Sequence, residues 1–320
     1  MTTGAVAIVS LVVALVATPL AIVVARRTGI MDQPGMLKSQ EVAIPYLGGI
    51  GVFAGLAVGV LNGRPSVLVP LAAGLVLGVA DDRFGIPPLS RLAGELGVGA
   101  AVVVTCPVHV AGYVAVLLLV PITVLLINGV NLLDGLDMLA GGVVAVAAVG
   151  FAVILHEPGR SMAVGLGAAL AGFLVFNRPP ARIYLGDGGS YLLGTALAVL
   201  LADTWAPDVA VSTGTAALAL VAVPVAEVAF AVIRRLRGRR SLLAGDRRHP
   251  YDRLVTRGWP RVLASAAYIG VELLLTVAVI FAFHRSSVRV AVIVDVLAGI
   301  VLVAAAAGTG ALSPDQEAHR

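Results

Sequence analysis

Long apolar runs, separated by short polar segments, make up most of this chain. The runs are rich in Val, Ala, Leu and Gly and do not alternate with a period of two, so they predict helices rather than the strands of a barrel. A helix needs roughly 20 apolar residues to cross the hydrocarbon core of a membrane, and about 17 suffice. By that measure we expect eleven spans, at residues 4–25, 47–62, 65–80, 95–112, 114–128, 138–155, 161–177, 188–204, 209–232, 262–283 and 288–308.

The composition also points to a membrane protein. Hydrophobic residues make up 59% of the chain and charged residues only 12%, whereas a soluble domain carries about 25% charged residues. The single cysteine, Cys106, can form no intrachain disulfide. We therefore expect an all-α, polytopic protein of ten or eleven transmembrane helices, the count depending on the short break between 95–112 and 114–128. Residues 1–310 would form one integral membrane domain, and residues 311–320 a short polar tail.

The positive charges predict how the chain sits in the membrane. Most of the 22 lysine and arginine residues lie in the loops after the odd-numbered spans, above all in the loop 234–261. The positive-inside rule places these loops in the cytoplasm, so we expect a multi-pass protein of the plasma (inner) membrane. Arg26 and Arg27 follow the first apolar run, whereas a signal peptide carries its charge before it, so we expect an uncleaved first helix. Because the basic residues flank apolar spans, nucleic acid is not an expected partner.

Five aspartates fall on this same predicted side, each where an apolar helix meets the water: Asp81, Asp82, Asp134, Asp137 and Asp187. A carboxylate near hydrocarbon is costly, and several converging carboxylates repel one another unless a cation neutralises them. Hard divalent ions such as Mg²⁺ take oxygen ligands and usually retain phosphate or water oxygens as well. The pattern therefore predicts Mg²⁺-assisted handling of phosphate on the cytoplasmic face.

The aspartates lie in three motifs of unequal weight. The segment DDR at 81–83 could equally solvate a helix end. In NLLDGLD at 131–137 the polar residues are three apart and share a face if the segment is helical, which favours a functional interpretation. The segment GDGGS at 186–190 leads into a helix N-terminus, where backbone amides can receive phosphate oxygens. The last motif is weak alone, but the three together predict a site.

The basic residues have two interpretations. The run 234–240 is best explained as an orientation signal beside anionic lipid, whereas Arg247, Arg248 and His249 suit a diphosphate clamp. Lys38, the only lysine, could bind substrate or be one more inside charge. Glu227, near the inner end of the ninth span, could pair with a loop arginine or support the site.

Four blocks resemble, in order, the polyprenyl-phosphate N-acetylhexosamine-1-phosphate transferases, the family of the bacterial N-acetylglucosamine-1-phosphate transferases and phospho-MurNAc-pentapeptide transferase. They are DDRFG at 81–85, NGVNLLDGLD at 128–137, FNRPPARIYLGD at 176–187 and DRRH at 246–249. The likeness runs from residue 32 to residue 254.

The resemblance implies a Mg²⁺-dependent enzyme, with Mn²⁺ as an alternative metal, that transfers a sugar 1-phosphate from a UDP-sugar to a polyprenyl phosphate. The products would be UMP and a polyprenyl diphosphate-linked sugar that starts a cell-envelope glycan. N-acetylglucosamine is the favoured sugar because the last block is closest to that branch, while another UDP-N-acetylhexosamine or a MurNAc-pentapeptide donor stays open. The oligomeric state is open too, a homodimer included.

The family's motifs also imply roles for matched residues. The expected catalytic residues are Asp81, Asp82, Asp134 and His249, and the expected metal ligands are Asp187 and Asn131. The expected substrate-binding residues are Lys38, Asp137, Asn177, Tyr184, Arg247 and Arg248. Within these sets the resemblance assigns the pair at 81–82 to the lipid phosphate and the residues at 177 and 184 to the uracil.

The chain departs from the family pattern at three positions. His249-Pro250-Tyr251 lacks the second histidine of the usual His-x-His, Gln40 stands where many members have histidine, and Glu227 replaces a frequent aspartate. Because the aspartate set is intact, we expect an active but divergent member.

Three other classes remain as alternatives. A transporter or flippase would place carboxylates near mid-span, whereas these five lie at one face. A CDP-alcohol phosphotransferase would need paired Asp-Gly units and a later aspartate on one helix, and residues 134–138 do not continue that way. A non-catalytic scaffold with a degraded site would release no UMP from a UDP-sugar.

Overall fold

The computed structural model is a bundle of long helices with one small hairpin. It describes residues 1–33, 42–106, 112–239, 241 and 248–312. The α-helices are α1 (Thr3–Thr28), α2 (Gly48–Gly63), α3 (Leu68–Phe84), α4 (Pro88–Thr105), α5 (Gly112–Leu133), α6 (Leu139–Ile154), α7 (Gly159–Asn177), α8 (Gly186–Asp203), α9 (Val211–Ala217), α10 (Ala222–Arg237), α11 (Pro250–Thr256), α12 (Arg261–Arg285) and α13 (Val288–Gly308). Two 3₁₀ helices, η1 (Pro65–Val67) and η2 (Leu218–Val221), and the antiparallel strands β1 (Met31–Asp32) and β2 (Ile44–Pro45) complete it.

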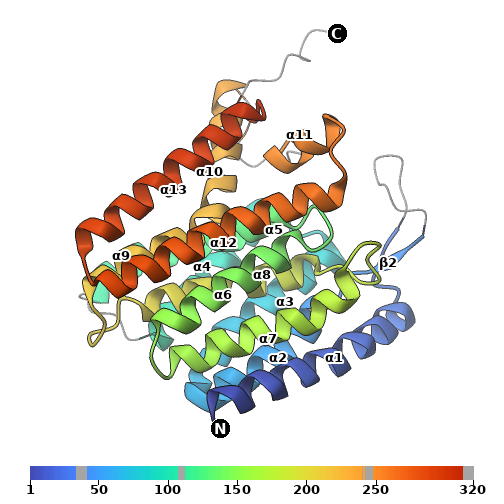
Figure 1. Cartoon of the computed structure of the whole chain (residues 1–320). Helices are drawn as coiled ribbons and strands as arrows, with labels where there is room; N and C mark the ends of the chain where they lie inside the picture. Colours follow the sequence, from blue (N-terminus) through green and yellow to red (C-terminus); the bar gives the residue numbers. More distant parts are fainter. Residues whose placement is uncertain (34–41, 107–111, 240, 242–247, 313–320) are drawn as a thin grey trace.

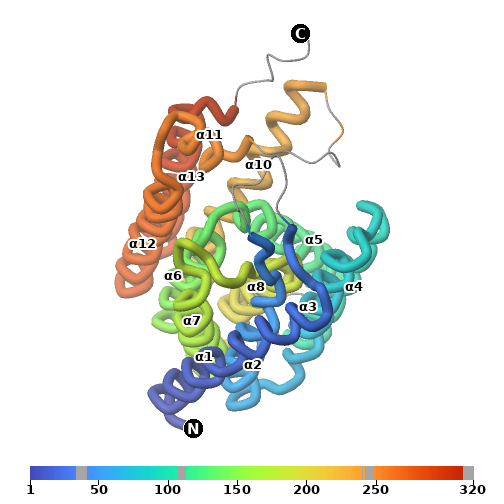
Figure 2. Tube along the Cα trace, turned by 90° about the vertical axis from the view of Figure 1, so that its right-hand side faces the viewer, coloured from blue at the N-terminus to red at the C-terminus, as the bar shows by residue number. Residues whose placement is uncertain are grey.

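Helix α8 forms the core of the bundle. Every residue from Gly188 to Asp203 is buried, and α8 packs against α3, α5 and α2, as Figure 2 shows at the centre of the trace. The helix is apolar all round, which is the pattern of a helix with no exposed face. Gly194 lets it approach α5 closely, because a Cβ there would collide with the backbone of Ile127.

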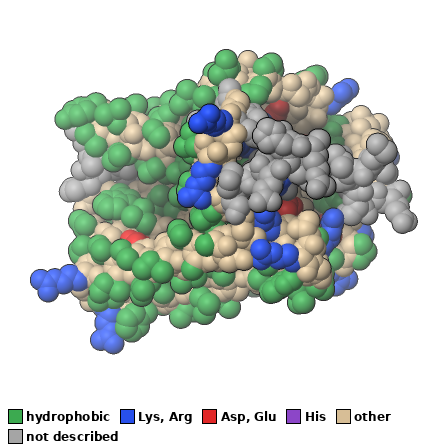
Figure 3. Space-filling view, turned by 90° about the horizontal axis from the view of Figure 1, so that it is seen from above, with side chains coloured by type: hydrophobic (Ala, Val, Ile, Leu, Met, Phe, Trp, Pro, Cys, Tyr) green, Lys and Arg blue, Asp and Glu red, His purple; other side chains and the backbone are tan. Residues whose placement is uncertain are grey.

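The outer helices expose apolar side chains instead of polar ones. On α1, α12 and α13 the exposed side chains include Ile8, Val12, Leu274, Val277, Phe281, Ile293, Val296 and Ile300. Figure 3 shows apolar side chains over much of one face, with arginine side chains beside the grey residues and at the left edge of the view. Such a surface suits lipid rather than water.

Six helices in the described part of the chain are long and apolar enough to cross a membrane: Thr3–Thr28, Tyr113–Leu133, Gly159–Asn177, Val211–Arg237, Arg261–Arg285 and Val288–Gly308. Length and composition therefore make this a multi-pass, all-helical membrane protein. Each of the eleven expected spans overlaps a helix, but the remaining helices do not meet this criterion.

Local differences from the expectation have physical causes. Helix α4 begins at Pro88 rather than residue 95, since proline at the first helical position needs no N–H partner. The ninth expected span is one continuous apolar run but is broken into α9, η2 and α10. Pro224 lies in the first turn of α10 and supplies no backbone N–H. Helix α11 and the hairpin were not expected.

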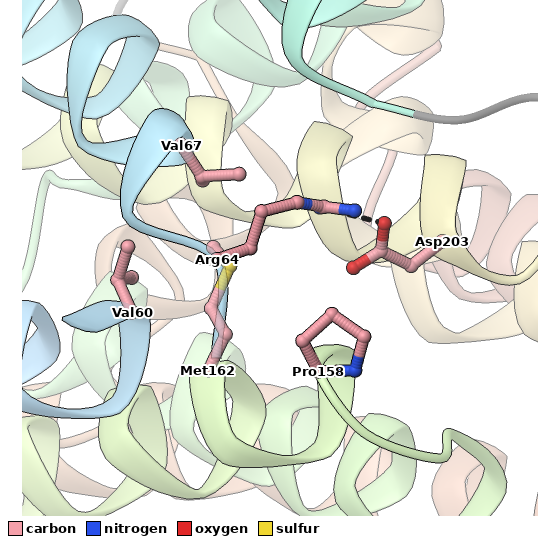
Figure 4. Close-up of a pocket in the computed structure, with 6 residues that line it drawn as sticks. All are labelled: Val60, Arg64, Val67, Pro158, Met162 and Asp203. Carbon is pink, nitrogen blue, oxygen red and sulfur yellow. Dashed lines mark hydrogen bonds and ion pairs between the residues drawn. The ribbon is translucent and has the colours of Figure 1, made fainter. Parts of the chain in front are cut away.

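The two ends of the bundle differ in character. In Figure 1 the N-terminus lies at the lower left, and strand β2 lies at the right. At the N-terminal end, Arg64 and Asp203 form an ion pair of 2.7 Å beside Pro158, around a cavity of about 10 Å³ (Figure 4). This contact ties α2 to α8. The sequence motifs lie at the opposite end.

Candidate active site

A cavity of about 1630 Å³ opens at the motif-bearing end of the bundle. It is lined by residues of α3, α4, α5, α7, α8, α10, α11 and α12, by the strands β1 and β2 and by nearby loops. Eight of the residues singled out in the sequence line it: Asp82, Asn131, Asp134, Asp137, Asn177, Tyr184, Asp187 and His249. The structure thus brings together motifs more than 150 residues apart in sequence. Lys38 and Arg247 lie outside the described residues, and Arg248, although described, is not part of this lining.

The first turn of α8 carries Asp187 into the cavity. Its Oδ1 accepts a hydrogen bond of 2.6 Å from Nδ2 of Asn131, whose amide also donates to Oγ of Ser190 over 3.1 Å. Gly186, just before it, adopts a left-handed φ of 74°, and a Cβ there would collide with the carbonyl oxygen of Tyr46. Glycine is therefore required at the turn that presents Asp187.

Asp81 and Asp82 have different surroundings although they are adjacent in α3. Oδ2 of Asp82 accepts from the backbone N–H of Gly188 over 3.2 Å and faces the cavity. Asp81 is 8% exposed and accepts from Ile86 N at 2.8 Å and from the hydroxyl of Tyr191 at 2.8 Å. Its Oδ2 also lies 3.4 Å from Arg91. The role predicted for the pair remains a prediction for both residues. In the structure Asp82 lines the cavity, and Asp81 joins α3 to α4 and α8.

The loop between α5 and α6 supplies Asp134 and Asp137. Burial raises the pKa of Asp134 well above its ordinary value, and the carboxylates of Asp187 and Asp82 raise it further. Burial also raises the pKa of Asp137, although Oδ2 accepts a hydrogen bond of 3.1 Å from Ala181 N that favours the charged form. A bound cation would reverse these shifts by stabilising the carboxylates.

Asn177 and Tyr184 enclose the same side of the cavity. Oδ1 of Asn177 accepts from Met138 N at 2.8 Å, and its Nδ2 donates to the carbonyl of Ile183 at 2.9 Å. This buried amide thus connects the start of α6 to the loop before α8. The predicted contact of Asn177 with the uracil stays a prediction. Burial, followed by the charge of Asp137, raises the pKa of Tyr184 to about 12, so its hydroxyl stays a hydrogen-bond donor at neutral pH.

His249 enters the cavity from the N-cap of α11. It is 2% exposed, and its Nδ1 lies 2.8 Å from Oε2 of Glu227. The expected second histidine is replaced by Tyr251, whose ring stacks on the imidazole at 5.4 Å between centroids and 8° between planes. Glu227, which the sequence left open between two roles, therefore contacts the site through His249.

Several lining residues were not predicted as site residues: Tyr46, Arg91, Arg235, Tyr251 and Arg261. Arg91 and Arg235 had been explained as inside charges of the membrane topology. Both side chains lie on the face of their helix that borders the cavity. The run 234–240 contains several arginines, and the sequence does not indicate which of them lines the cavity.

Within the described part of the chain, no three His, Cys, Asp or Glu side chains lie close enough together to hold a metal ion by themselves. The side chains around Asp187 do offer the oxygen donors that Mg²⁺ prefers, namely carboxylates and one amide. Mg²⁺ is commonly bound by one or two carboxylates together with substrate phosphates, so this donor set fits it.

The fold and the site define a polytopic, all-helical membrane protein with acidic and basic side chains around a large cavity. The family model described as "Glycosyl transferase family 4" matches residues 65–204. The probable undecaprenyl-phosphate N-acetylglucosaminyl 1-phosphate transferase of Bacillus subtilis is 30% identical over 274 residues, 78% of this chain and 76% of that protein. The chain belongs to this family of polyprenyl-phosphate N-acetylglucosamine-1-phosphate transferases.

Two further relatives give the same result. The decaprenyl-phosphate N-acetylglucosaminephosphotransferase of Mycobacterium tuberculosis is 29% identical over 332 residues, 86% of this chain and 82% of that protein. The undecaprenyl-phosphate alpha-N-acetylglucosaminyl 1-phosphate transferase of Escherichia coli K12 is 29% identical over 264 residues, covering 74% and 72%. The resemblance inferred from the four sequence blocks is confirmed.

Proposed function

We propose that this enzyme transfers N-acetylglucosamine 1-phosphate from UDP-N-acetylglucosamine to a polyprenyl phosphate. The relatives' names give undecaprenyl or decaprenyl phosphate as acceptor and N-acetylglucosamine 1-phosphate as the transferred group. The observation that carries the proposal is that one cavity joins the aspartates to an apolar wall.

The apolar wall suits the acceptor's prenyl chain. Among the residues that line it are Leu92, Leu96, Pro121, Val124, Leu125, Val228 and Val232, from α4, α5 and α10. A prenyl chain on this wall would leave its phosphate at the polar end, near Asp82 and Arg91. Burying apolar surface would then hold the acceptor without any contact to the reacting atoms.

The chemistry is a phosphoryl transfer. An oxygen of the acceptor phosphate attacks the sugar-linked phosphorus of the donor, and the bond from that phosphorus to the oxygen bridging to UMP breaks. UMP leaves, and the polyprenyl diphosphate-linked sugar is formed. The acceptor oxygen is already ionised near neutral pH, so the main barrier is repulsion between nucleophile and diphosphate. Arg91, Arg235 and Arg261 line the cavity and can reduce that repulsion.

Magnesium is part of the proposal. Asp187 and Asn131 would hold the ion, which when bound supplies charge neutralisation at the donor diphosphate. Asn131 presents its Nδ2 to Asp187 here, so its Oδ1 would bind metal after the amide turns over. Asp134 and Asp137 would lie on the donor side, with Tyr184 against the uracil.

We further propose that all eleven apolar segments cross the plasma membrane and that the cavity opens to the cytoplasm. The support is the excess of arginine at this end. A Cys106→Ser background with Arg27→Cys or Asp208→Cys tests the orientation in intact cells. A membrane-impermeant maleimide should label Asp208→Cys only, and labelling of Arg27→Cys alone would invert the topology.

The activity itself is tested by UMP release. Purified protein with Mg²⁺, undecaprenyl phosphate and each of several UDP-sugars in turn should release UMP with UDP-N-acetylglucosamine. Release should require the lipid acceptor, which separates transfer from hydrolysis. No release with any UDP-sugar would refute the transferase proposal, and release with another sugar only would correct the donor.

A further inference from the structure

Glu227 is a buried carboxyl group whose two oxygens are both engaged. It lies on α10 and is 1% exposed. Its Oε2 is 2.8 Å from Nδ1 of His249, and its Oε1 accepts a hydrogen bond of 2.6 Å from the hydroxyl of Tyr268 on α12. Residues of three separate elements therefore meet at this carboxyl group. Of Glu227, His249 and Tyr268, His249 is the one that lines the cavity.

We propose that Glu227 is a positioning residue, which together with Tyr268 sets the ring orientation and tautomer of His249 for the transfer reaction. The inference rests on the proposed function and goes further by assigning a role to a residue outside the cavity lining. A carboxylate at Nδ1 keeps the proton on that nitrogen, so Nε2 is the nitrogen directed to another partner. A carboxylate that orients a functional histidine through its second nitrogen commonly controls activity without touching substrate.

The ring of His249 is also held from its face and from its backbone. Tyr251 stacks on it and donates its own hydroxyl to the carbonyl of Leu132 at 2.8 Å, two residues before Asp134. The backbone N–H of His249 donates to Oδ2 of Asp252 at 3.1 Å in a capping box. The tyrosine at the place of the usual second histidine thus joins α11 to the last turn of α5, just before the loop that carries Asp134.

The burial of Glu227 supports a role beyond packing. Burying a carboxylate has a desolvation cost, and an apolar side chain of similar volume would pack α10 against α12 without that cost. Glu272 provides a contrast and a matched control. It is fully buried on α12, yet neither of its oxygens has a hydrogen-bond partner among the described residues.

The experiment is a double-mutant cycle on UMP release by the purified full-length protein. Glu227→Gln keeps the shape and should lower kcat about 10–100-fold with little change in KM. His249→Ala should lower kcat about 100–1000-fold. If Glu227 acts through His249, the double variant should match His249→Ala within about twofold. Tyr268→Phe should lower kcat less than Glu227→Gln, Glu227→Asp should recover part of the loss, and Glu272→Gln should leave kcat unchanged.

Each outcome decides between the interpretations. Multiplied losses in the double variant, or an equal loss in Glu272→Gln, would show that Glu227 acts only through general stability and would overturn the inference. Should Glu227→Gln fail to fold in detergent, Tyr268→Phe with and without His249→Ala completes the same cycle. If the unsubstituted protein releases UMP but the kcat losses of the two single variants multiply in the double variant, this inference alone is overturned. No release by the unsubstituted protein overturns the proposed function and this inference with it.

Discussion

Nδ2 of Asn131 donates a hydrogen bond of 2.6 Å to Oδ1 of Asp187, which joins the end of α5 to the first turn of α8. The contact fixes the carboxylate at the wall of the cavity, next to a left-handed Gly186. A short hydrogen bond to an ionised acceptor is stronger than a neutral one. The contact holds Asp187 at the cavity wall in one rotamer, which supports the metal-ligand role proposed for it.

Replacing Asp187 should abolish turnover without unfolding the protein. Asp187→Asn keeps the volume and the contact with Asn131 but removes the charge, so kcat should fall about 1000-fold or more. The melting temperature should stay close to that of the unsubstituted protein. UMP release and thermal unfolding in detergent measure the two quantities. Asp208→Asn is the control, because Asp208 is exposed and lies at the end of the bundle opposite the cavity. Near-normal turnover by Asp187→Asn would show that Asp187 is not a metal ligand.

The two neighbouring aspartates of α3 should separate stability from activity. Asp81→Asn disturbs hydrogen bonds from Tyr191 and Ile86 and should lower the free energy of unfolding by about 1–3 kcal/mol. Asp82→Asn should lower turnover with a much smaller effect on stability, because Asp82 faces the cavity. Thermal unfolding and UMP release on both variants test this. Equal stability of the two variants would contradict the division of roles.

The sequence predicted the helical architecture, and its motifs supplied eight residues that line the candidate cavity, because both inferences depend on local patterns. Apolar runs of sufficient length predict helices, and charge at their ends predicts which loops share a side. Phase around a helix is harder to infer. Consecutive residues of a helix are about 100° apart, so Asp81 and Asp82 point in different directions, and composition does not indicate which of them lines the cavity.

The elements around His249 could not be predicted for a different reason. Helix α11 has seven residues and no apolar periodicity, and it depends on Pro250 at its first turn and on the capping contact of Asp252. The contact of Glu227 with His249 joins residues on separate elements across a polar loop. A single sequence carries no signal for such a long-range pair, although the place of Glu227 near the inner end of the ninth expected span marked it as a residue that could support the site.

Removal of divalent ions should stop the reaction reversibly. The predicted ligands around Asp187 are oxygen donors, and Mg²⁺ binds such sets weakly enough for a chelator to remove it. EDTA should reduce UMP release to background, and Mg²⁺ in excess should restore it, with Mn²⁺ as a substitute. Ca²⁺, which accepts looser geometry, should restore less. Full activity in EDTA after prolonged dialysis would contradict a metal-dependent transfer.

Asp134→Asn should stabilise the metal-free protein while it inactivates the enzyme. Burial and the charges of Asp187 and Asp82 raise the folded-state pKa of Asp134 well above its unfolded value. The folded protein then binds a proton that the unfolded chain releases, so stability is fully present below the unfolded pKa and is lost as the pH rises through the folded pKa. The Asp134→Asn variant has no carboxylate at this position, so it does not lose this stability as the pH rises. In EDTA at neutral pH, the melting temperature of Asp134→Asn should therefore exceed that of the unsubstituted protein. The difference should shrink as the pH falls through the folded pKa and vanish below the unfolded pKa of about 3.9, where Asp134 is protonated in both states. With saturating Mg²⁺ the difference in melting temperature should narrow or reverse, because the ion stabilises the charged carboxylates.

Melting curves at several pH values, with and without Mg²⁺, measure this difference. An Asp134→Asn variant less stable than the unsubstituted protein in EDTA would contradict the prediction.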